Sequence, residues 1–570
     1  MSTSTLAHLR AANIPWLQHI TVLASTFYFF AFSEVRTFLI LYGLTAFLFD
    51  TEALLAALQD PTEPPLIPHP YLPFLGHVIG MFWYGASYFA RVNAKTQYPI
   101  FTLQTLTART IAVIDPVLAA PIQRASKNLS FYGMILEVTK RLVDFDEQSM
   151  EIIRFNLDGE HGSSEGLMNE SQEMIASELS PGRGLNQLST TQLDKFSELL
   201  SDLVRGTSTL EISLMDFVKR IFTIANAYTI YGPQNPFAMH PELVHKFWDY
   251  ESGMIAVMAN VFPFITARKP WLARKAINEA LQEFVEKGYY RTASTMIQKR
   301  VQINLKHGLT TKMAGRAELI LLFGVIGNAV PTTFWFLANV FGRPALLQKI
   351  RIETSQAISS TRSRDGKVKE KIINVTDLKT KCPLLVSTYR ETLRTIANLA
   401  SVRLVTNTHS VSAPGHPPYL LKKGSMIQIA SGVIHGSESV WGADANSFNP
   451  TRFISSTTSS EQFSSETGAS ISAERTATAL PKNVPSAAYR AFGGGSVICP
   501  GRHFAQSEIL GFVALCVQML DIEDVKGGTF DVPERDDQRI PLSVMKPVKE
   551  PQVVVKRRKG EEDVIWRLEL

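Results

Sequence analysis

A long run of helical pattern constrains the fold of this chain more than any other feature. From about residue 117 to residue 400 the pattern is mostly helical, and residues 317–342 read "AELILLFGVIGNAVPTTFWFLANVFG". Residues 101–116, "FTLQTLTARTIAVIDP", are rich in Thr, Ile and Val and break at Asp-Pro, which predicts a short β-hairpin. We therefore expect a mainly α-helical protein with small β-sheets.

Length and composition limit the class of protein. The chain has 570 residues, more than a usual domain, but no change in composition divides it, so we expect one large folded unit with appendages. Its three cysteines, Cys382, Cys499 and Cys516, are too few for a secreted disulfide scaffold, which indicates a reducing compartment. The formal net charge of +5 comes without a clustered Lys/Arg stripe, so no nucleic-acid partner is expected.

The N-terminus carries an apolar segment. Residues 14–49 are long enough to cross a bilayer, but Glu34 and Arg36 interrupt them, and neither flanking piece alone reaches the ~20 residues of a full span. A single tilted span and a span plus an interfacial helix both stay open. A cleaved signal peptide is disfavoured by the long apolar run, the weakly charged start and the low cysteine count. We expect residues 1–50 to form a retained membrane anchor.

Two further segments mark boundaries. Residues 51–76 include "DPTEPPLIPHPYLP", where prolines block helix formation and favour an extended path, and we interpret this region as a hinge between membrane and body. The body then runs over residues 77–570. Within it, residues 454–488 are rich in Ser and Thr and poor in large apolar residues, which is typical of an exposed, mobile insertion.

Cys499 stands in the stretch "RAFGGGSVICPGRHFA", residues 490–505, after a glycine-rich turn and before an apolar run. Such a turn lets the main chain approach closely, and nearby backbone N–H donors stabilise a thiolate. Zinc would need several Cys or His ligands at short spacing, and only His503 is near. A redox dithiol would need a second cysteine close by in the sequence. From these residues alone, a catalytic thiol and a plain core cysteine both remain open.

The whole string resembles the haem-binding loop of cytochromes P450. The matching positions are Phe492, Gly495, Cys499, Gly501 and Ala505. The family's usual Arg or His two residues before the cysteine, which pairs with a haem propionate, is Val497 here. The resemblance implies the P450 fold from about residue 60 onwards, a haem b cofactor whose iron is bound by the Cys499 thiolate, and Phe492, Gly495 and Gly501 beside that cofactor.

Two upstream motifs add to this resemblance. "YRETLR" places Glu391 and Arg394 three residues apart on one helical face, and "ADANSFNPTRF" resembles the family's Phe-x-Pro-x-Arg-Phe segment. The resemblance implies that Arg452 completes a buried structural triad with Glu391 and Arg394, in which fork-like hydrogen bonds satisfy one shared carboxylate. Arg403 lies where the family has a basic residue that reaches a haem propionate. An exposed strand arginine is the other interpretation of Arg403.

The apolar segment 317–342 corresponds to the oxygen-activating helix of the resembling family. Most members carry an acid followed by a Thr there, whereas Gly327 and Asn328 occupy these positions here, and Pro331 is expected to kink the helix. This pattern resembles the branch that includes cholesterol and oxysterol 7α-hydroxylases, sterol 12α-hydroxylases and prostacyclin synthase. Asn328 is the candidate catalytic residue, which either orients a water for proton delivery or contacts substrate.

The resemblance implies a haem-thiolate monooxygenase that oxidises a lipophilic substrate, such as a steroid, a terpenoid or a related natural product, with O2. Electrons would come from NADPH through cytochrome P450 reductase, with cytochrome b5 as a further partner, docking near Arg502 and His503. We expect the endoplasmic reticulum membrane, with the catalytic domain facing the cytosol. An isomerase that rearranges a peroxide without a reductase is the alternative, followed by a non-catalytic haem or lipid sensor.

Overall fold

The computed structural model describes residues 51–52, 54, 56–105, 108–157, 166–204, 209–362, 369–398, 400–455, 478–539 and 544–570, together with Thr37. Apart from Thr37, the anchor predicted for residues 1–50 lies outside the described residues, and so do residues 456–477 of the predicted insertion. Both therefore stay predictions. The described ends of the insertion meet at an antiparallel bridge between Ile454 and Thr478.

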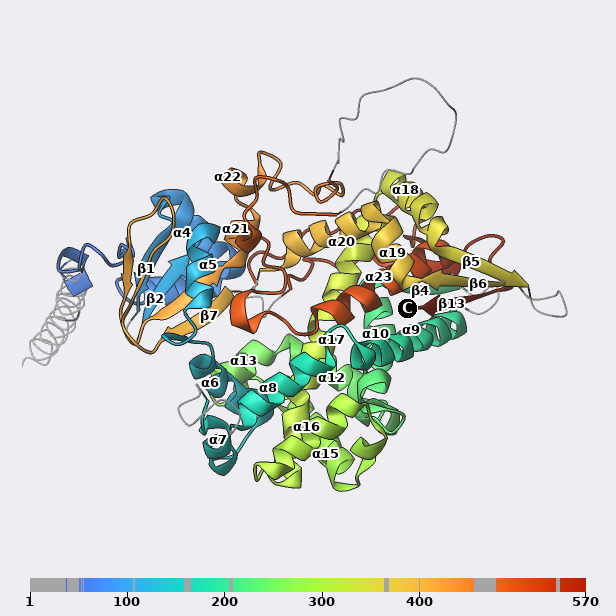
Figure 1. Cartoon of the computed structure of the whole chain (residues 1–570), viewed down its shortest axis with the longest axis horizontal. Helices are drawn as coiled ribbons and strands as arrows, with labels where there is room; N and C mark the ends of the chain where they lie inside the picture. Colours follow the sequence, from blue (N-terminus) through green and yellow to red (C-terminus); the bar gives the residue numbers. More distant parts are fainter. Residues whose placement is uncertain are drawn as a thin grey trace, which may run out of the picture.

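The described body is mainly helical and carries small sheets toward opposite ends of its long axis (Figure 1), which confirms the fold class predicted from the sequence. The longer helices are α6 (Tyr132–Val143), α8 (Leu167–Glu178), α9 (Arg183–Leu203), α10 (Leu214–Tyr231), α12 (Leu243–Ser252), α15 (Arg268–Glu286), α16 (Thr295–Lys306), α17 (Thr311–Phe341), α18 (Pro344–Thr354), α20 (Pro383–Ile396) and α23 (Arg502–Met519). The shorter helical segments are α3 (Gly76–Tyr84), η1 (Gly85–Ser87), α4 (Tyr88–Thr96), α5 (Pro116–Arg124), α7 (Glu147–Arg154), α11 (Pro236–Met239), α13 (Met254–Ala259), α14 (Pro263–Thr266), η2 (Tyr289–Thr292), η3 (Ser355–Ala357), α19 (Val375–Lys381), α21 (Ser431–His435), α22 (Glu438–Trp441), η4 (Ser486–Ala488) and η5 (Gly495–Val497).

The largest sheet has five strands in the order β1-β2-β10-β7-β3. Its first two strands form the predicted hairpin, with Ile100 opposite Val113, so that prediction is confirmed. β10 joins β2 in parallel and β7 antiparallel. The strands of this sheet are β1 (Ile100–Gln104), β2 (Arg109–Val113), β3 (Leu129–Ser130), β7 (Ala400–Val405) and β10 (Met426–Ala430). The smaller sheets contain β4 (Thr209–Ser213), β11 (Leu520–Asp524) and β12 (Gln552–Arg557); β5 (Ile358–Arg362), β6 (Lys369–Asn374) and β13 (Val564–Glu569); and β8 (His409–Val411) with β9 (Tyr419–Leu421).

The proline-rich segment before α3 packs along this five-stranded sheet. Its backbone bonds to Thr102 of β1, whose N–H donates to the Pro65 carbonyl at 2.7 Å. The buried carboxylate of Glu63 pairs with Arg109 of β2 at 2.6 Å and with Lys422 at 2.5 Å. Prolines hold the chain extended, and an extended chain can follow a strand edge. The segment is thereby attached to the body by ionic and backbone contacts.

Helix α17 is a central element against which several other helices pack. The Thr310 hydroxyl caps its N-terminus by accepting the N–H of Met313 at 3.2 Å. Every residue from Ala329 to Phe341 is buried, and α10, α15, α20 and α23 all contact the helix. Within the described parts of the chain, α17 is the one helix long and apolar enough to cross a membrane, but most of it is buried inside the protein.

Pro331 does not end α17, which continues unbroken to Phe341. A proline inside a helix has no N–H to give to the carbonyl four residues before it, here that of Gly327. One residue further along the helix, the Thr332 hydroxyl donates to the Asn328 carbonyl at 2.7 Å. The kink predicted at Pro331 stays a prediction.

A buried carboxyl group joins α23 to two neighbouring helices. Glu508 of α23 accepts hydrogen bonds from the side-chain amides of Gln192 on α9 at 3.1 Å and Asn226 on α10 at 3.2 Å. Burial is the main cause that raises the pKa of Glu508 from 4.5 to about 8, although the two amide donors act in the opposite direction. The amide oxygens of Gln192 and Asn226 have no partner among the described residues, so they can accept a hydrogen bond from a protonated carboxyl or an amide.

We therefore predict that Glu508→Gln removes a pH dependence of stability. Between pH 4.5 and about 8 the unfolded chain ionises this group while the folded protein keeps it protonated, so the free energy of unfolding falls as pH rises through that window. One pKa unit corresponds to about 1.4 kcal/mol. The free energy of unfolding of the variant should exceed that of the wild type by at least about this amount near pH 8, and by little near pH 4.5. Denaturant titrations across this range measure the difference. Glu198→Gln, at an exposed site on α9, is the control. If Glu508→Gln raised the free energy of unfolding equally at all pH values, the prediction would be contradicted.

Candidate functional site

The loop between Arg490 and α23 is closed on itself by backbone hydrogen bonds. The Cys499 N–H donates to the Phe492 carbonyl at 3.0 Å, and the Ile498 N–H donates to the Gly495 carbonyl at 3.3 Å. Gly495 has φ +68°, and a Cβ there would lie 2.9 Å from the backbone oxygen of Gln123 in α5. Only glycine fits both conditions, so this position lets the loop lie directly on α5.

Cys499 lies three residues before the start of α23. Although the residue has solvent-exposed surface, desolvation by the protein around its thiol raises the thiol's pKa, whereas backbone N–H groups of Gly501 and Arg502 that hydrogen-bond the sulfur, together with the Arg502 charge, lower it. The Arg502 side chain also donates to the Cys499 carbonyl at 3.1 Å. Of the three cysteines, Cys499 is exposed, while Cys382 and Cys516 are buried. Burial raises the pKa of Cys382 to about 12 and that of Cys516 well above its usual value, so neither resembles a thiolate site.

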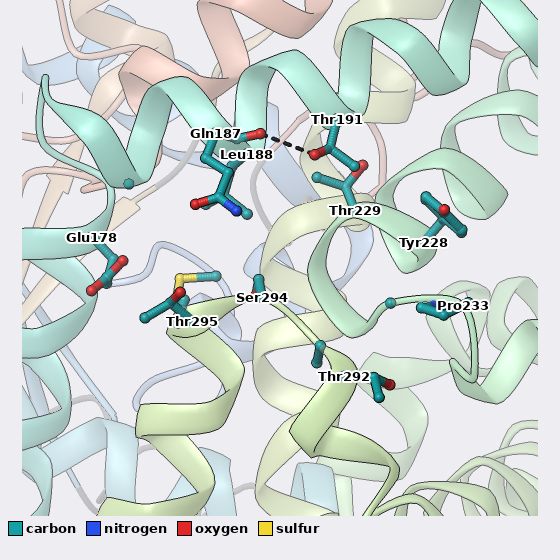
Figure 2. A pocket seen from close by; sticks show the side chains of 14 residues that line it. Glu178, Gln187, Leu188, Thr191, Tyr228, Thr229, Pro233, Thr292, Ser294 and Thr295 are labelled. Atoms are coloured by element: carbon teal, nitrogen blue, oxygen red, sulfur yellow. Dashed lines mark hydrogen bonds between the residues drawn. The ribbon is translucent and has the colours of Figure 1, made fainter.

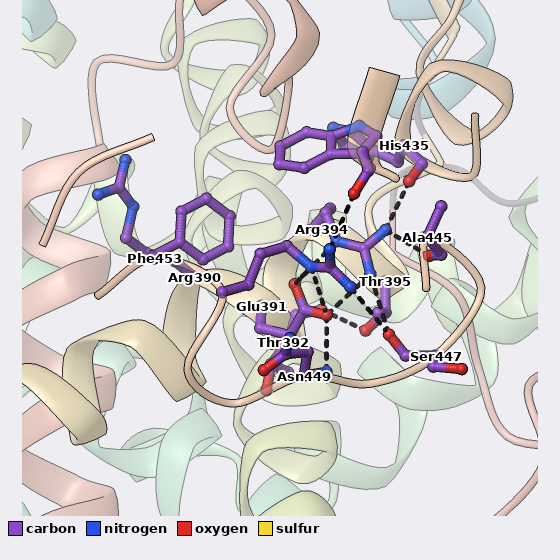
Figure 3. A network of polar contacts seen from close by, with 12 residues as sticks. Arg390, Glu391, Thr392, Arg394, Thr395, His435, Ala445, Ser447, Asn449 and Phe453 are labelled. Carbon is purple, nitrogen blue, oxygen red and sulfur yellow. Dashed lines mark hydrogen bonds and ion pairs between the residues drawn. The ribbon is translucent and has the colours of Figure 1, made fainter. Parts of the chain in front are cut away.

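Glu391, Arg394 and Arg452 meet in the structure, and Figure 3 shows Glu391 and Arg394 in this network. The Arg394 guanidinium on α20 binds the Glu391 carboxylate with two hydrogen bonds of 2.8 Å, and Arg452 Nε donates to the same carboxylate at 3.1 and 3.2 Å. The N–H of Asn449 adds a bond of 2.9 Å. Arg452 also pairs with Asp444 at 2.9 Å. Two guanidinium groups and two carboxylates therefore neutralise one another at this site.

His435 connects this charged cluster to the cysteine loop. Its backbone carbonyl accepts a hydrogen bond from Arg394, while its ring Nε2 accepts the backbone N–H of Arg490 at 2.9 Å. The other ring nitrogen then carries the proton and donates to the Ala397 carbonyl at 3.0 Å. Burial is the main reason that the pKa of His435 falls to about 3, so the ring is neutral and can accept.

Arg403 lies buried on β7 instead of standing at the surface. Its Nη1 donates to the Val402 carbonyl at 2.7 Å and to the Ser401 hydroxyl at 3.2 Å, and its guanidinium lies 5.0 Å from the Phe131 ring centroid. Its Nη2 has no hydrogen-bond partner among the described residues, and the same holds for Nη2 of buried Arg490. Of the two interpretations of Arg403, the exposed strand arginine is therefore wrong.

Asn328 lies on α17. Leu321, Gly324, Val325 and Asn328 recur three to four residues apart and are incompletely buried, although the helix around them is mostly buried. A Cβ on Gly324 would meet no atom within 4 Å, whereas one on Gly327 would lie 2.8 Å from the Phe323 ring. The Asn328 side chain makes no hydrogen bond within the described parts of the chain. One face of α17 is thus open beside an amide that is free to bind.

A pocket lies among helices of the body. It has a volume of about 200 Å³ between α8, α9, α10 and α16, and Figure 2 shows the polar side chains of Glu178, Thr191, Thr229 and Thr295 around it. Neither the cysteine loop nor Asn328 contributes to its lining. This pocket is therefore distinct from the candidate site around Cys499.

Comparison with known proteins decides the family. The sequence profile described as Cytochrome P450 matches residues 198–554. The chain is 30% identical to the cytochrome P450 monooxygenase nodJ of Hypoxylon pulicicidum, over 90% of this chain and 93% of that protein. The chain belongs to the cytochrome P450 family. This P450 is also 29% identical to a cytochrome P450 monooxygenase of Gibberella zeae, over 89% of the chain and 91% of the relative.

The same comparison supports the branch predicted from the sequence. The human 7-alpha-hydroxycholest-4-en-3-one 12-alpha-hydroxylase is 24% identical over 86% of this chain and 92% of its own length. The P450 described here is thus an oxidoreductase, a haem-dependent monooxygenase whose family binds haem iron through a thiolate.

The residues present fit such a cofactor. The one exposed cysteine lies at a helix N-terminus, α17 has an open face at Gly324, and two buried guanidinium groups keep donors without partners. A dicarboxylate such as haem b can satisfy donors of this kind. The sequence had drawn attention to Arg403 but missed Arg490 and His435. The sequence could have indicated Arg490 through its position at the start of the glycine-rich loop. No sequence feature marked His435.

We predict that Arg394→Ala abolishes haem incorporation. Removing one partner of a buried ion pair leaves an uncompensated charge and costs about 3–5 kcal/mol, and here it also removes the bonds to the His435 and Ala445 carbonyls. The haem-to-protein ratio and denaturant unfolding measure the effect. Arg567→Ala, which breaks the exposed pair with Glu370, should cost about 0.2–1 kcal/mol and is the control. A soluble, fully haem-loaded Arg394→Ala protein would count against this role.

Proposed function

We propose that this P450 hydroxylates or otherwise oxidises a lipophilic small molecule, such as a steroid, a terpenoid or a related natural product. It uses O2 and electrons that NADPH supplies through cytochrome P450 reductase. The observation that carries the proposal is the exposed Cys499 thiol at the N-terminus of α23, within a chain of this family. The similarity to sterol 12-alpha-hydroxylases supports a steroid-like substrate.

Cys499 is the proposed ligand of the haem iron, and Phe492, Gly495 and Gly501 shape the loop that presents it. When bound, the haem supplies the activation of O2, which a thiolate ligand favours. The N–H groups of Gly501 and Arg502 hold the sulfur at the helix N-terminus, where negative charge is stabilised. The triad keeps this loop in place through His435.

The open face of α17 receives the substrate in this proposal. Leu321 and Val325 offer apolar contact beside Gly324, where a side chain would take up open space. Asn328 follows them on the same face of the helix and supplies an amide that can both donate and accept a hydrogen bond. Its proposed role is to orient a water that delivers protons.

Electron delivery takes place at the cysteine end of the molecule. Arg502 and His503 are partly exposed in the first turn of α23, and basic groups there attract an acidic reductase or cytochrome b5. A turnover assay with purified reductase tests this step: product formation that depends on NADPH and O2 supports the proposal. Rearrangement of a supplied peroxide without NADPH would favour the isomerase instead.

We also propose that the protein lies on the endoplasmic reticulum membrane with the catalytic domain in the cytosol. Two segments expose large apolar side chains that a lipid surface would cover. They belong to α3 and to the α13–α14 region: Val78, Ile79, Phe82 and Trp83; Val261, Phe262, Phe264 and Ile265. Together with the anchor predicted at the N-terminus, these segments support membrane association.

Cys499→His should lose the red-shifted thiolate band of the ferrous–CO spectrum. Imidazole would replace the thiolate as the strongest donor at this position, and the band depends on thiolate ligation. Cys382→Ser, at a buried cysteine away from the loop, should retain the band and serves as the matched control. Retention of the band by Cys499→Ala would disprove the assignment.

Asn328→Ala should separate electron use from product formation. If the amide positions a proton-delivering water, the variant keeps the thiolate–CO band and NADPH oxidation but diverts electrons to hydrogen peroxide. The ratio of peroxide to product, measured with reductase and a substrate found by haem spectral shifts over a steroid and terpenoid library, should rise by about tenfold, equivalent to about 1.4 kcal/mol. Thr332→Val, one turn further along α17, removes a hydroxyl that bonds within the helix and is the control. Unchanged coupling in Asn328→Ala would show that the amide is only packed there.

A further inference from the structure

Buried arginines in this protein fall into two groups. The described residues include five of them: Arg274, Arg300, Arg394, Arg403 and Arg490. Three pair with a carboxylate: Arg274 with Asp144 at 3.3 Å, Arg300 with Glu318 at 3.0 Å and Arg394 with Glu391 at 2.8 Å. Arg403 and Arg490, which are 2% and 1% exposed, have no carboxylate within 4.0 Å among the described residues. These two are the buried arginines in the described structure that lack a carboxylate partner.

The contacts of Arg490 fix its position without satisfying its charge. Its backbone N–H is held by the His435 ring at 2.9 Å, and its Nε donates to the Ser431 hydroxyl at 3.3 Å. Neutral acceptors of this kind do not balance a positive charge, and Nη2 has no partner in the described structure. The guanidinium therefore still requires an anionic acceptor.

Arg403 lies close enough to Arg490 for the two charges to repel. Burial lowers the pKa of each to about 10, and the charge of Arg403 contributes to the lowering at Arg490. Both groups remain charged at neutral pH. Burying an unpaired ion costs several kcal/mol, so a site that concentrates two like charges is suited to a ligand with two negative charges.

The pair borders the cysteine loop. Arg490 precedes Phe492 by two residues at the start of this loop. Gln123, whose Nε2 is another buried donor without a partner, lies against the loop at Gly494. Val497, by contrast, can neither donate a hydrogen bond nor carry a charge.

We propose that Arg490 is a cofactor-binding residue which, together with Arg403, binds the two propionate groups of the haem. Arg490 supplies the cation that Val497 cannot. This inference rests on the proposed ligation of the haem by Cys499. Haem b carries two carboxylates, which matches two guanidinium groups, and each guanidinium can present two N–H groups to one carboxylate.

Esterifying the propionates tests this directly. Ferric holoenzymes that carry haem b or its dimethyl ester, prepared by cofactor exchange, are mixed with excess apomyoglobin, and haem transfer is followed by absorbance. In the wild type, the ester should be lost at least about tenfold faster, equivalent to about 1.4 kcal/mol. Arg490→Gln should lose haem b faster by a similar factor. In this variant, esterification should increase the transfer rate by a smaller factor than it does in the wild type.

The control is a buried arginine outside the site. Arg300→Gln breaks the pair with Glu318 and lowers stability. Expressed as free energies, the effects of this substitution and of esterification on the haem-transfer rate should be additive. A purely structural role for Arg490 gives the same additivity, so additive effects in Arg490→Gln would overturn the proposal. The propionate bending band in resonance Raman spectra gives a second readout, which should shift in Arg490→Gln and not in Arg300→Gln.

Failure of this inference is distinguishable from failure of the proposed function. Loss of the thiolate–CO band in wild-type protein would refute Cys499 as ligand, whereas an intact band with additive ester effects refutes only Arg490. If Arg490→Gln does not fold with haem, the wild type alone decides, because equal transfer rates for haem b and its ester would show that neither arginine holds a propionate. Arg490→Lys keeps the charge but not the paired N–H groups of the guanidinium. Its rate of haem b loss should lie between those of the wild type and Arg490→Gln.

Discussion

One buried carboxylate holds together the part of the fold that surrounds the cysteine. Glu391 is fully buried on α20 and is surrounded by the guanidinium groups of Arg394 and Arg452. Because Arg394 also reaches the carbonyls of His435 and Ala445, the segment that follows β10 is fixed to α20 by the same group. His435 then passes this constraint to the backbone of Arg490, where the cysteine loop begins. The loop's position therefore depends on a charge cluster outside it.

Charge balance separates this cluster from the neighbouring Arg403–Arg490 pair. In the cluster, two guanidinium groups are matched by the carboxylates of Glu391 and Asp444, so it is complete within the protein. Arg403 and Arg490 have no such match among the described residues. Burying a charge is costly unless it is paired. The unpaired arginines therefore destabilise the folded protein, and binding of an acidic ligand offsets this loss. Cofactor binding and folding are coupled wherever a ligand binds only the folded state.

The sequence predicted those features that depend on neighbouring residues. The hairpin of β1 and β2, the mainly helical body and the shared helical face of Glu391 and Arg394 all follow from local pattern and helical spacing. His435 and Arg490 could not be found in this way, because their partners lie 41 and 55 residues away in the chain. The side chain of Arg403 gave no local signal of burial, since a strand position can face either the core or solvent.

The family and the cysteine loop were determined by the sequence alone, because the order of glycines, cysteine and helix requires only short-range geometry. Which buried charges are neutralised and which still need a partner was decided only by the tertiary structure. Arg452 and Arg490 each precede an apolar residue in the sequence, yet packing brings Glu391, 61 residues away in the chain, to the first and only neutral groups to the second. Electrostatic pairing acts over a few ångströms in space. The number of residues between two charged groups in the sequence does not reveal how far apart they lie in the fold.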